Sequence, residues 1–181
     1  GGFGSFAAAL SNEFGKLGGT LRTGAGVVSV TQDNSGPRIV ASDGFDRTAG
    51  HLIWSAPLDA LASSFGGAAP EAVIEAAGRL SYRSMNLLYI QIENGPYTRF
   101  DAHYFPDGSI SFSRMSEPGN YPCAAREGRT GLCLELPCDR GGDGWGAGPA
   151  DLFAMLSHDL EGSPLASPEG VSDIWTRRLS H

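Results

Sequence analysis

Residues able to do acid–base or binding chemistry gather in one stretch, HYFPDGSISFSRMSEPGNYP, which begins at His103. It carries Tyr104, Arg114 and Glu117 as well, and such side chains can move a proton, hold an anion or line a binding site. His103 and Tyr104 are neighbours in an expected strand, so they point to opposite faces and only one can face a given cavity. Arg114 and Glu117 bracket the end of the next expected strand, where a simple ion pair is as good an interpretation as a site role. The stretch is therefore a reactive site, the wall of a site, or plain surface.

A nucleophilic or metal site finds little support elsewhere in the sequence. The four histidines are scattered, and no G-x-S-x-G elbow is present, which argues against a hydrolase. Cys133 and Cys138 have no second pair of metal ligands, so no metal is predicted. The opening Gly1-Gly2-Phe3-Gly4 precedes a helix and could approach a phosphate, but it is no G-x-G-x-x-G after a strand, and a helix-entry loop is favoured.

Composition narrows the class of protein. The chain has 181 residues with a net charge of −7, and the absence of a basic stripe argues against a nucleic-acid-binding surface. Its three cysteines are an odd number, which favours reduced thiols and a cytoplasmic location over a disulfide scaffold. No apolar run approaches the length of a transmembrane segment. Because the sequence opens on GGFGS without methionine, we expect a processed product or a piece of a longer protein.

The first half of the chain alternates short helices and strands. Apolar residues at helical spacing predict a helix over 5–17, and TLRT, VVSVT and PRIVAS predict a small β-meander. HLIWSAP, residues 51–57, has the composition of a buried strand that ends at a proline turn. Two short helices are expected over 57–65 and 70–79.

The second half is expected to form an antiparallel sheet. Four β-type runs cover 84–93, 98–105, 109–115 and 131–137, and Asp107-Gly108 predicts a hairpin between the middle two. An amphipathic helix follows over 149–162, and the chain after Pro164 is left unassigned. The fold class is α+β: an antiparallel sheet with flanking helices, plus a small β-meander and strand. We place the domain boundary at GGAAP, giving residues 1–66 and 67–181.

Several segments, taken in order, resemble the flavin-dependent amine oxidases, most closely the subgroup that includes protoporphyrinogen oxidase and UDP-galactopyranose mutase. GGFGSFAAALSNEFGKLGGTLRTGAGVVSV is similar to the glycine-led helix, double glycine and valine-bearing strand of that family. HLIWSAPLDAL is similar to its return strand, which ends in small residues and proline beside the cofactor. LSYRSMNLLYIQIE, HYFPDGSISFSRMSEPGNYP, TGLCLELPCDRGGDGW and PADLFAMLSHDLE look like its substrate-binding half. The resemblance runs over about residues 1–162.

The resemblance implies a cofactor, FAD, in the parent enzyme, and a first lobe, 1–66, that contributes part of its site. It implies that Val27 lies near the adenine through its backbone. It also implies that Gly1 and Gly2 approach the flavin and that three small residues close over the cofactor, namely Ser55, Ala56 and Pro57. The flavin would remove a hydride from a C–N or C–C bond of a small organic substrate, or serve a non-redox rearrangement as in the mutase branch.

The second lobe would roof the substrate cavity, with Tyr104 and Arg114 as candidate lining, so the opening stretch becomes a wall of a flavin site. The chain departs from the family in lacking G-x-G-x-x-G with an acidic residue about 20 positions on, which argues against firm FAD retention by this chain alone. The missing dinucleotide-binding domain would then be its partner. The alternative is a stand-alone, non-catalytic small-molecule-binding module that has lost the flavin site.

Overall fold

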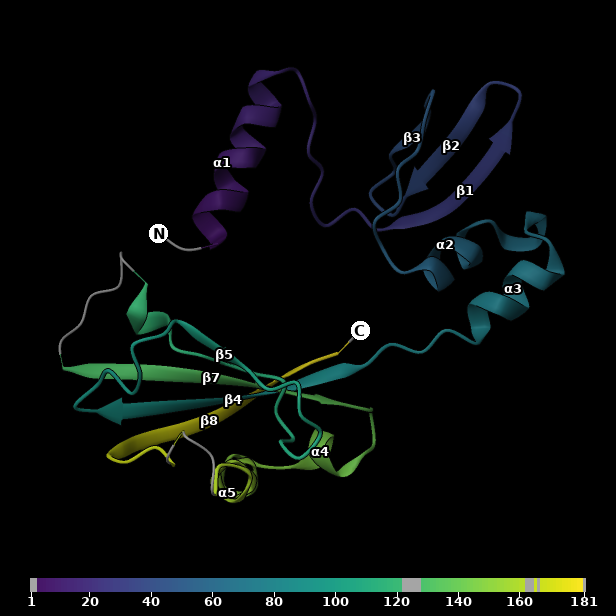
Figure 1. Ribbon diagram of the computed structural model, residues 1–181. Helices are drawn as coiled ribbons and strands as arrows, with labels where there is room; N and C mark the ends of the chain where they lie inside the picture. The colour runs from purple at the N-terminus through teal and green to yellow at the C-terminus, as the bar shows by residue number, and fades with distance from the viewer. Residues whose placement is uncertain (1–2, 122–127, 162–164, 166, 181) are drawn as a thin grey trace. The chain divides into compact units, whose positions relative to one another are not determined.

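The computed structural model describes residues 3–121, 128–161, 165 and 167–180, and these form two compact units that meet in the sequence at Ser81 and Tyr82 (Figure 1). The expected α+β class, with antiparallel sheets and flanking helices, is confirmed. The functional boundary at 66/67 stays a prediction.

The first unit contains a helix, a small sheet and a pair of short helices. Helix α1 spans Phe3–Lys16, and the sheet β1-β2-β3 is antiparallel. The strand and helix bounds are β1 Val27–Asp33, β2 Gly36–Ala41, β3 Asp46–Thr48, α2 Leu58–Ser64, η1 Gly66–Ala68 and α3 Glu71–Gly78. The β1–β2 turn needs glycine at position 36, where φ is 114° and a Cβ would lie 2.3 Å from the Ala49 carbonyl oxygen.

Two expectations for this unit need correction. The TLRT segment is not a strand, so the meander is built from β1, β2 and β3 alone. Residues 51–57 are also not a strand: Ile53 is 93% exposed, and within the described chain this segment has no ladder partner. A strand is stable only when its backbone groups bond to a neighbouring strand. In the sheet of this unit, β1, β2 and β3 pair with one another and not with residues 51–57.

The second unit is a five-stranded antiparallel sheet in the order β5-β6-β7-β4-β8. Its elements are β4 Ser84–Glu93, β5 Ala102–Tyr104, β6 Arg114–Ser116, η2 Pro118–Asn120, β7 Arg129–Cys138, α4 Asp143–Gly146, α5 Pro149–Asp159 and β8 Val171–Leu179. The long central strands β4 and β7 pair along their whole length, from Ser84 with Cys138 to Glu93 with Arg129.

The expected hairpin is real but shorter in its strands than the sequence indicates. Ala102 pairs with Ser116 and Tyr104 with Arg114, so a loop rather than an Asp-Gly turn joins β5 to β6. Asp107 accepts a hydrogen bond from the Ser109 backbone N–H at 2.9 Å, which makes the tip a local Asx turn. The unassigned tail forms β8, whose residues pair with β4 from Met85 with Leu179 to Ile92 with Val171.

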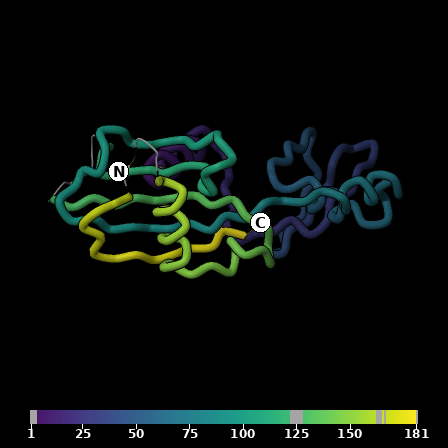
Figure 2. The backbone as a smooth tube through the Cα atoms, turned by 60° about the horizontal axis from the view of Figure 1, so that its bottom comes forward, coloured from purple at the N-terminus to yellow at the C-terminus, as the bar shows by residue number. Residues whose placement is uncertain are grey.

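The core of this unit lies on one face of the sheet. Helix α5 crosses that face (Figures 1 and 2) and contributes Leu152, Leu156 and, just beyond its end, Leu160. The sheet contributes alternate residues, because successive side chains of a strand point to opposite faces: Leu88, Ile90, Ile92, Met115, Leu132, Leu134 and Leu136. The face of the sheet that α5 covers therefore carries the apolar core, and the opposite face takes no part in it.

Candidate functional site

The candidate site is the face of the five-stranded sheet that α5 does not cover, here called the open face. Register places three rows of side chains on it. The first row runs Tyr104, Arg114, Glu135, Leu87, Arg177; the second runs Ala102, Ser116, Cys133, Tyr89, Trp175; and the third runs Gly131, Gln91, Asp173. Polar and aromatic residues dominate these rows, whereas the covered face is mostly apolar, with Ser84, Asn86 and Thr130 as its buried polar residues on β4 and β7.

Arg114 and Tyr104, the two predicted substrate-binding residues, are brought together on the open face. They pair across β5 and β6, and the Arg114 guanidinium lies 6.0 Å from the centre of the Tyr104 ring. Arg114 also forms an ion pair with Glu135 of β7. Hydrogen bonds to Tyr104 and Glu135 raise the pKa of Arg114, so it remains a cation. Tyr104 itself is 70% exposed, which leaves its ring accessible to a ligand.

Glu117 does not pair with Arg114, contrary to the simple ion pair considered from the sequence. Its carboxylate is 1% exposed and accepts hydrogen bonds from the backbone N–H groups of Tyr97 and Thr98, at 2.8 and 2.9 Å. The hydroxyl groups of Thr98 and Thr130 donate to it as well, at 3.2 and 2.7 Å. Glu117 therefore fixes the segment after β4 to the start of β7, which is a structural role.

His103 lies on the opposite side of β5 from Tyr104, as the alternation predicts. Its Nε2 lies 3.0 Å from the Thr98 hydroxyl, and its ring meets Phe100 edge to face. A histidine held this way next to Thr98 belongs to the same hydrogen-bonded loop as Glu117, and it does not reach the open face.

Tyr89 and Trp175 stack in the middle of the open face, with ring centres 5.3 Å apart and planes at 6°. Next to them on β7 is Cys133, which is half-buried. Burial raises the pKa of the Cys133 thiol, and a hydrogen bond from Tyr89 offsets this only in part. Burial and the neighbouring Cys133 also raise the pKa of Tyr89. Both groups are thus neutral at physiological pH.

Cys133 should consequently be a poor nucleophile. At pH 8 we expect its alkylation by iodoacetamide to be at least about tenfold slower in the folded chain than in the urea-unfolded chain, because the thiolate is the reactive form. Peptide mapping by mass spectrometry separates Cys133 from Cys123 and Cys138. Equal rates in the folded and unfolded chains would show that neither burial nor the raised pKa protects this thiol.

Among the predicted cofactor-binding residues, Val27, Ser55 and Ala56 line one groove of about 390 Å³ in the first unit. Leu52, Ile53, Trp54 and Ala60 complete its lining. Pro57 lies at the end of this segment, where its carbonyl oxygen accepts a hydrogen bond from Trp54 Nε1 at 3.1 Å. The small side chains of Ser55 and Ala56 leave space for a ligand. Gly1 and Gly2 lie outside the described residues.

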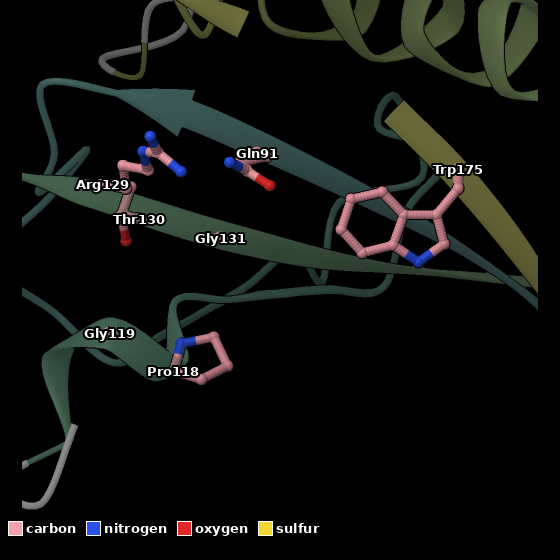
Figure 3. Close-up of a pocket in the computed structure, with 7 residues that line it drawn as sticks. All are labelled: Gln91, Pro118, Gly119, Arg129, Thr130, Gly131 and Trp175. Carbon is pink, nitrogen blue, oxygen red and sulfur yellow. The ribbon is translucent and has the colours of Figure 1, made fainter. Parts of the chain in front are cut away.

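Sequence reasoning missed a second hollow, a basin of about 370 Å³ on the open face (Figure 3). Gln91, Gly131 and Trp175, each from a different strand, line it together with Pro118 of η2 and Arg129 of β7. In the sequence, Gly131 is simply the first residue of the strand predicted over 131–137. Its significance comes from its register opposite Gln91, where the missing side chain opens space on the open face.

Neither a metal site nor a membrane span is found in the residues that the structure describes. No group of three or more His, Cys, Asp or Glu residues is arranged to hold an ion there. Within the same residues, no helix has the length and apolar character to cross a bilayer.

Comparison with known proteins identifies the family. The family model described as flavin containing amine oxidoreductase matches residues 1–143, and the chain belongs to this family. No curated protein sequence matches the chain.

Several solved structures share the fold. A reduced UDP-galactopyranose mutase is 22% identical with a TM-score of 0.63, over 89% of this chain and 35% of its own. An oxidoreductase from Methanosarcina mazei is 17% identical with a TM-score of 0.65, over 93% and 40%. A triple mutant of putrescine oxidase is 14% identical with a TM-score of 0.56, over 84% and 33%. The chain thus spans well under half the length of the structures it matches.

Proposed function

We propose that this chain supplies the substrate-binding face and a cofactor-contacting groove of a longer FAD-dependent oxidoreductase. The observation that carries the proposal is the asymmetry of the five-stranded sheet. One face is packed by α5, while the open face holds the Tyr104–Arg114–Glu135 row and the Tyr89–Trp175 stack. Aromatic and polar side chains grouped on a sheet face that α5 does not cover are typical of a binding surface.

The cofactor proposal concerns the groove of the first unit. Val27, at the start of β1, would offer backbone atoms to the adenine, and the segment Ser55–Pro57 would cover the cofactor with little side-chain bulk. When bound, the flavin would accept a hydride from a C–H bond beside a C–N or C–C bond of the substrate, and loss of a proton would leave a double bond there. Tyr104 and Arg114 would orient that substrate, Arg114 as a permanent cation and Tyr104 as a hydroxyl and aromatic surface.

A bulky side chain in the groove should weaken FAD binding. We expect Ala56→Phe to lower FAD affinity by about tenfold or more, because overfilling a packed site costs about 1–3 kcal/mol. Titration of FAD fluorescence against the chain measures this, with weak binding expected for the unmodified chain because the dinucleotide fingerprint is missing. Ala68→Phe, at an exposed position of η1, is the matched control and should leave the affinity unchanged.

The competing proposal is a non-catalytic small-molecule-binding module that has lost the flavin site. Two results of the FAD titration would contradict the cofactor groove and favour the binding module. One is undetectable FAD binding by the unmodified chain, and the other is equal affinity of Ala56→Phe and Ala68→Phe for FAD. The cytoplasmic location expected from the cysteine content stays a prediction.

A further inference from the structure

We propose that the basin on the open face binds a neutral, planar aromatic ring that carries an amide or lactam edge. The ring would stack on Trp175 and form hydrogen bonds with the Gln91 carboxamide, with Gly131 providing the space. This inference deepens the proposed function, on which it rests, by assigning a class of substrate to the open face.

The stacking surface is the first part of the argument. Trp175 is an exposed aromatic residue on an edge strand, 43% accessible, yet its indole is held parallel to the Tyr89 ring. Tyr89 stacks against the indole but does not line the basin, whereas Trp175 does. Because the Trp175 side chain is already held in place, stacking a planar ligand on it would cost little side-chain conformational entropy.

The polar group is the second part. Gln91 points into the basin from β4, next to the indole (Figure 3). Within the described residues its carboxamide takes part in no hydrogen bond, while its backbone carbonyl accepts one from the Ser172 hydroxyl at 3.4 Å. A carboxamide offers two donors and one acceptor in a plane, which matches the edge of an amide or lactam.

Charge decides between a neutral and an anionic ring. Arg129, the cation of the basin, is already paired with Glu93 at 3.2 Å. Asp173 lies beside Gln91 in the strand register and adds a negative charge. An anionic ring would be repelled by Asp173, and Arg129 would have to leave Glu93 in order to attract it. A neutral ring has neither cost.

Gly131 makes the space and supplies the test. An added Cβ would come no closer than 3.9 Å, to the Ile90 carbonyl oxygen, so a larger residue fits the backbone and fills the basin instead. Gly131→Leu should keep the fold, since glycine is the weaker strand former. Gly108→Leu is the control, because a Cβ at that loop position has no neighbour within 4 Å.

The experiment is a titration of the 15N-labelled full chain by two-dimensional NMR, with three probes. Quinolin-2-one has both the plane and the lactam, decahydroquinolin-2-one keeps the lactam without the plane, and quinoline keeps the plane without the lactam. We expect quinolin-2-one to shift the Trp175 indole N–H and the Gly131 amide, while Trp54 and Trp145 stay unchanged. The other two probes should bind about threefold to tenfold more weakly.

The variants complete the test. Gly131→Leu should abolish these shifts and Gly108→Leu should leave them intact, while Gln91→Leu should remove the preference for quinolin-2-one over quinoline. The proposal is overturned if quinolin-2-one shifts neither signal, if all three probes bind alike, or if Gly131→Leu and Gln91→Leu both bind as the unmodified chain does. None of these measurements uses flavin, so failure here is distinct from failure of FAD binding in the first unit.

Discussion

Replacing Glu117 with alanine should destabilise the second unit by about 3–5 kcal/mol, because it leaves several buried donors without an acceptor. The two backbone N–H groups of Tyr97 and Thr98 both point at this carboxylate, and neither can turn away as a hydroxyl can. The Thr130 hydroxyl, 2.7 Å from the carboxylate, loses its acceptor too. Urea unfolding followed by circular dichroism gives the change in free energy.

The matching controls separate loss of the acceptor from loss of charge. Glu117→Gln keeps the shape and one acceptor oxygen but turns an N–H₂ group toward donors, so it should fall between alanine and the unmodified chain. Glu161→Ala removes an exposed carboxylate and should change stability by less than about 0.5 kcal/mol. A Glu117→Ala effect as small as that of Glu161→Ala would contradict the role assigned to this residue.

Phe112→Ala should have a comparable effect, about 3–5 kcal/mol, because it removes a fully buried aromatic ring from the core. Phe112 lies in the loop between β5 and β6, where it packs in the core with Met115. The same loop is tied near the end of α5 by a hydrogen bond from the Ser111 backbone N–H to Asp159, at 2.7 Å. We therefore expect loosening of the loop that precedes Arg114 as well as a loss of stability.

Phe100→Ala is the control for ring size, since Phe100 is 49% exposed. It should cost less than about 1 kcal/mol in the same urea titration. Amide hydrogen exchange over 105–113 then reports the loop directly. Unchanged exchange in Phe112→Ala would show that Phe112 does not anchor it, whatever the change in global stability.

The sequence predicts the elements that bury one face. Alternation in 84–93 and 131–137 and the helical spacing in 149–162 are strong because these segments share one apolar core. β8 escaped prediction because VSDIWTRRL lies at the edge of the sheet, where only Val171, Ile174 and Thr176 are partly buried and alternation is weak. Residues 51–57 were wrongly expected to form a strand because composition says nothing about the presence of a pairing partner.

The candidate site could be predicted only in part. The substrate-binding role of Tyr104 and Arg114 stays a prediction. The structure brings the two residues together because both lie in the expected hairpin, although a loop and not an Asp-Gly turn joins its strands. Gln91, Gly131 and Trp175 could not be found, since they come from strands separated by tens of residues and β8 was unknown. Their meeting depends on the order β7-β4-β8, which no local pattern encodes.

The most direct test of the central claim is the visible absorption spectrum of the natural protein, isolated from its source with an antibody raised against residues 82–181. The account predicts the two absorption bands of oxidised flavin, carried by a polypeptide heavier than 18.9 kDa on intact-mass analysis. A protein of 18.9 kDa without flavin absorption would contradict the account and favour a stand-alone binding module.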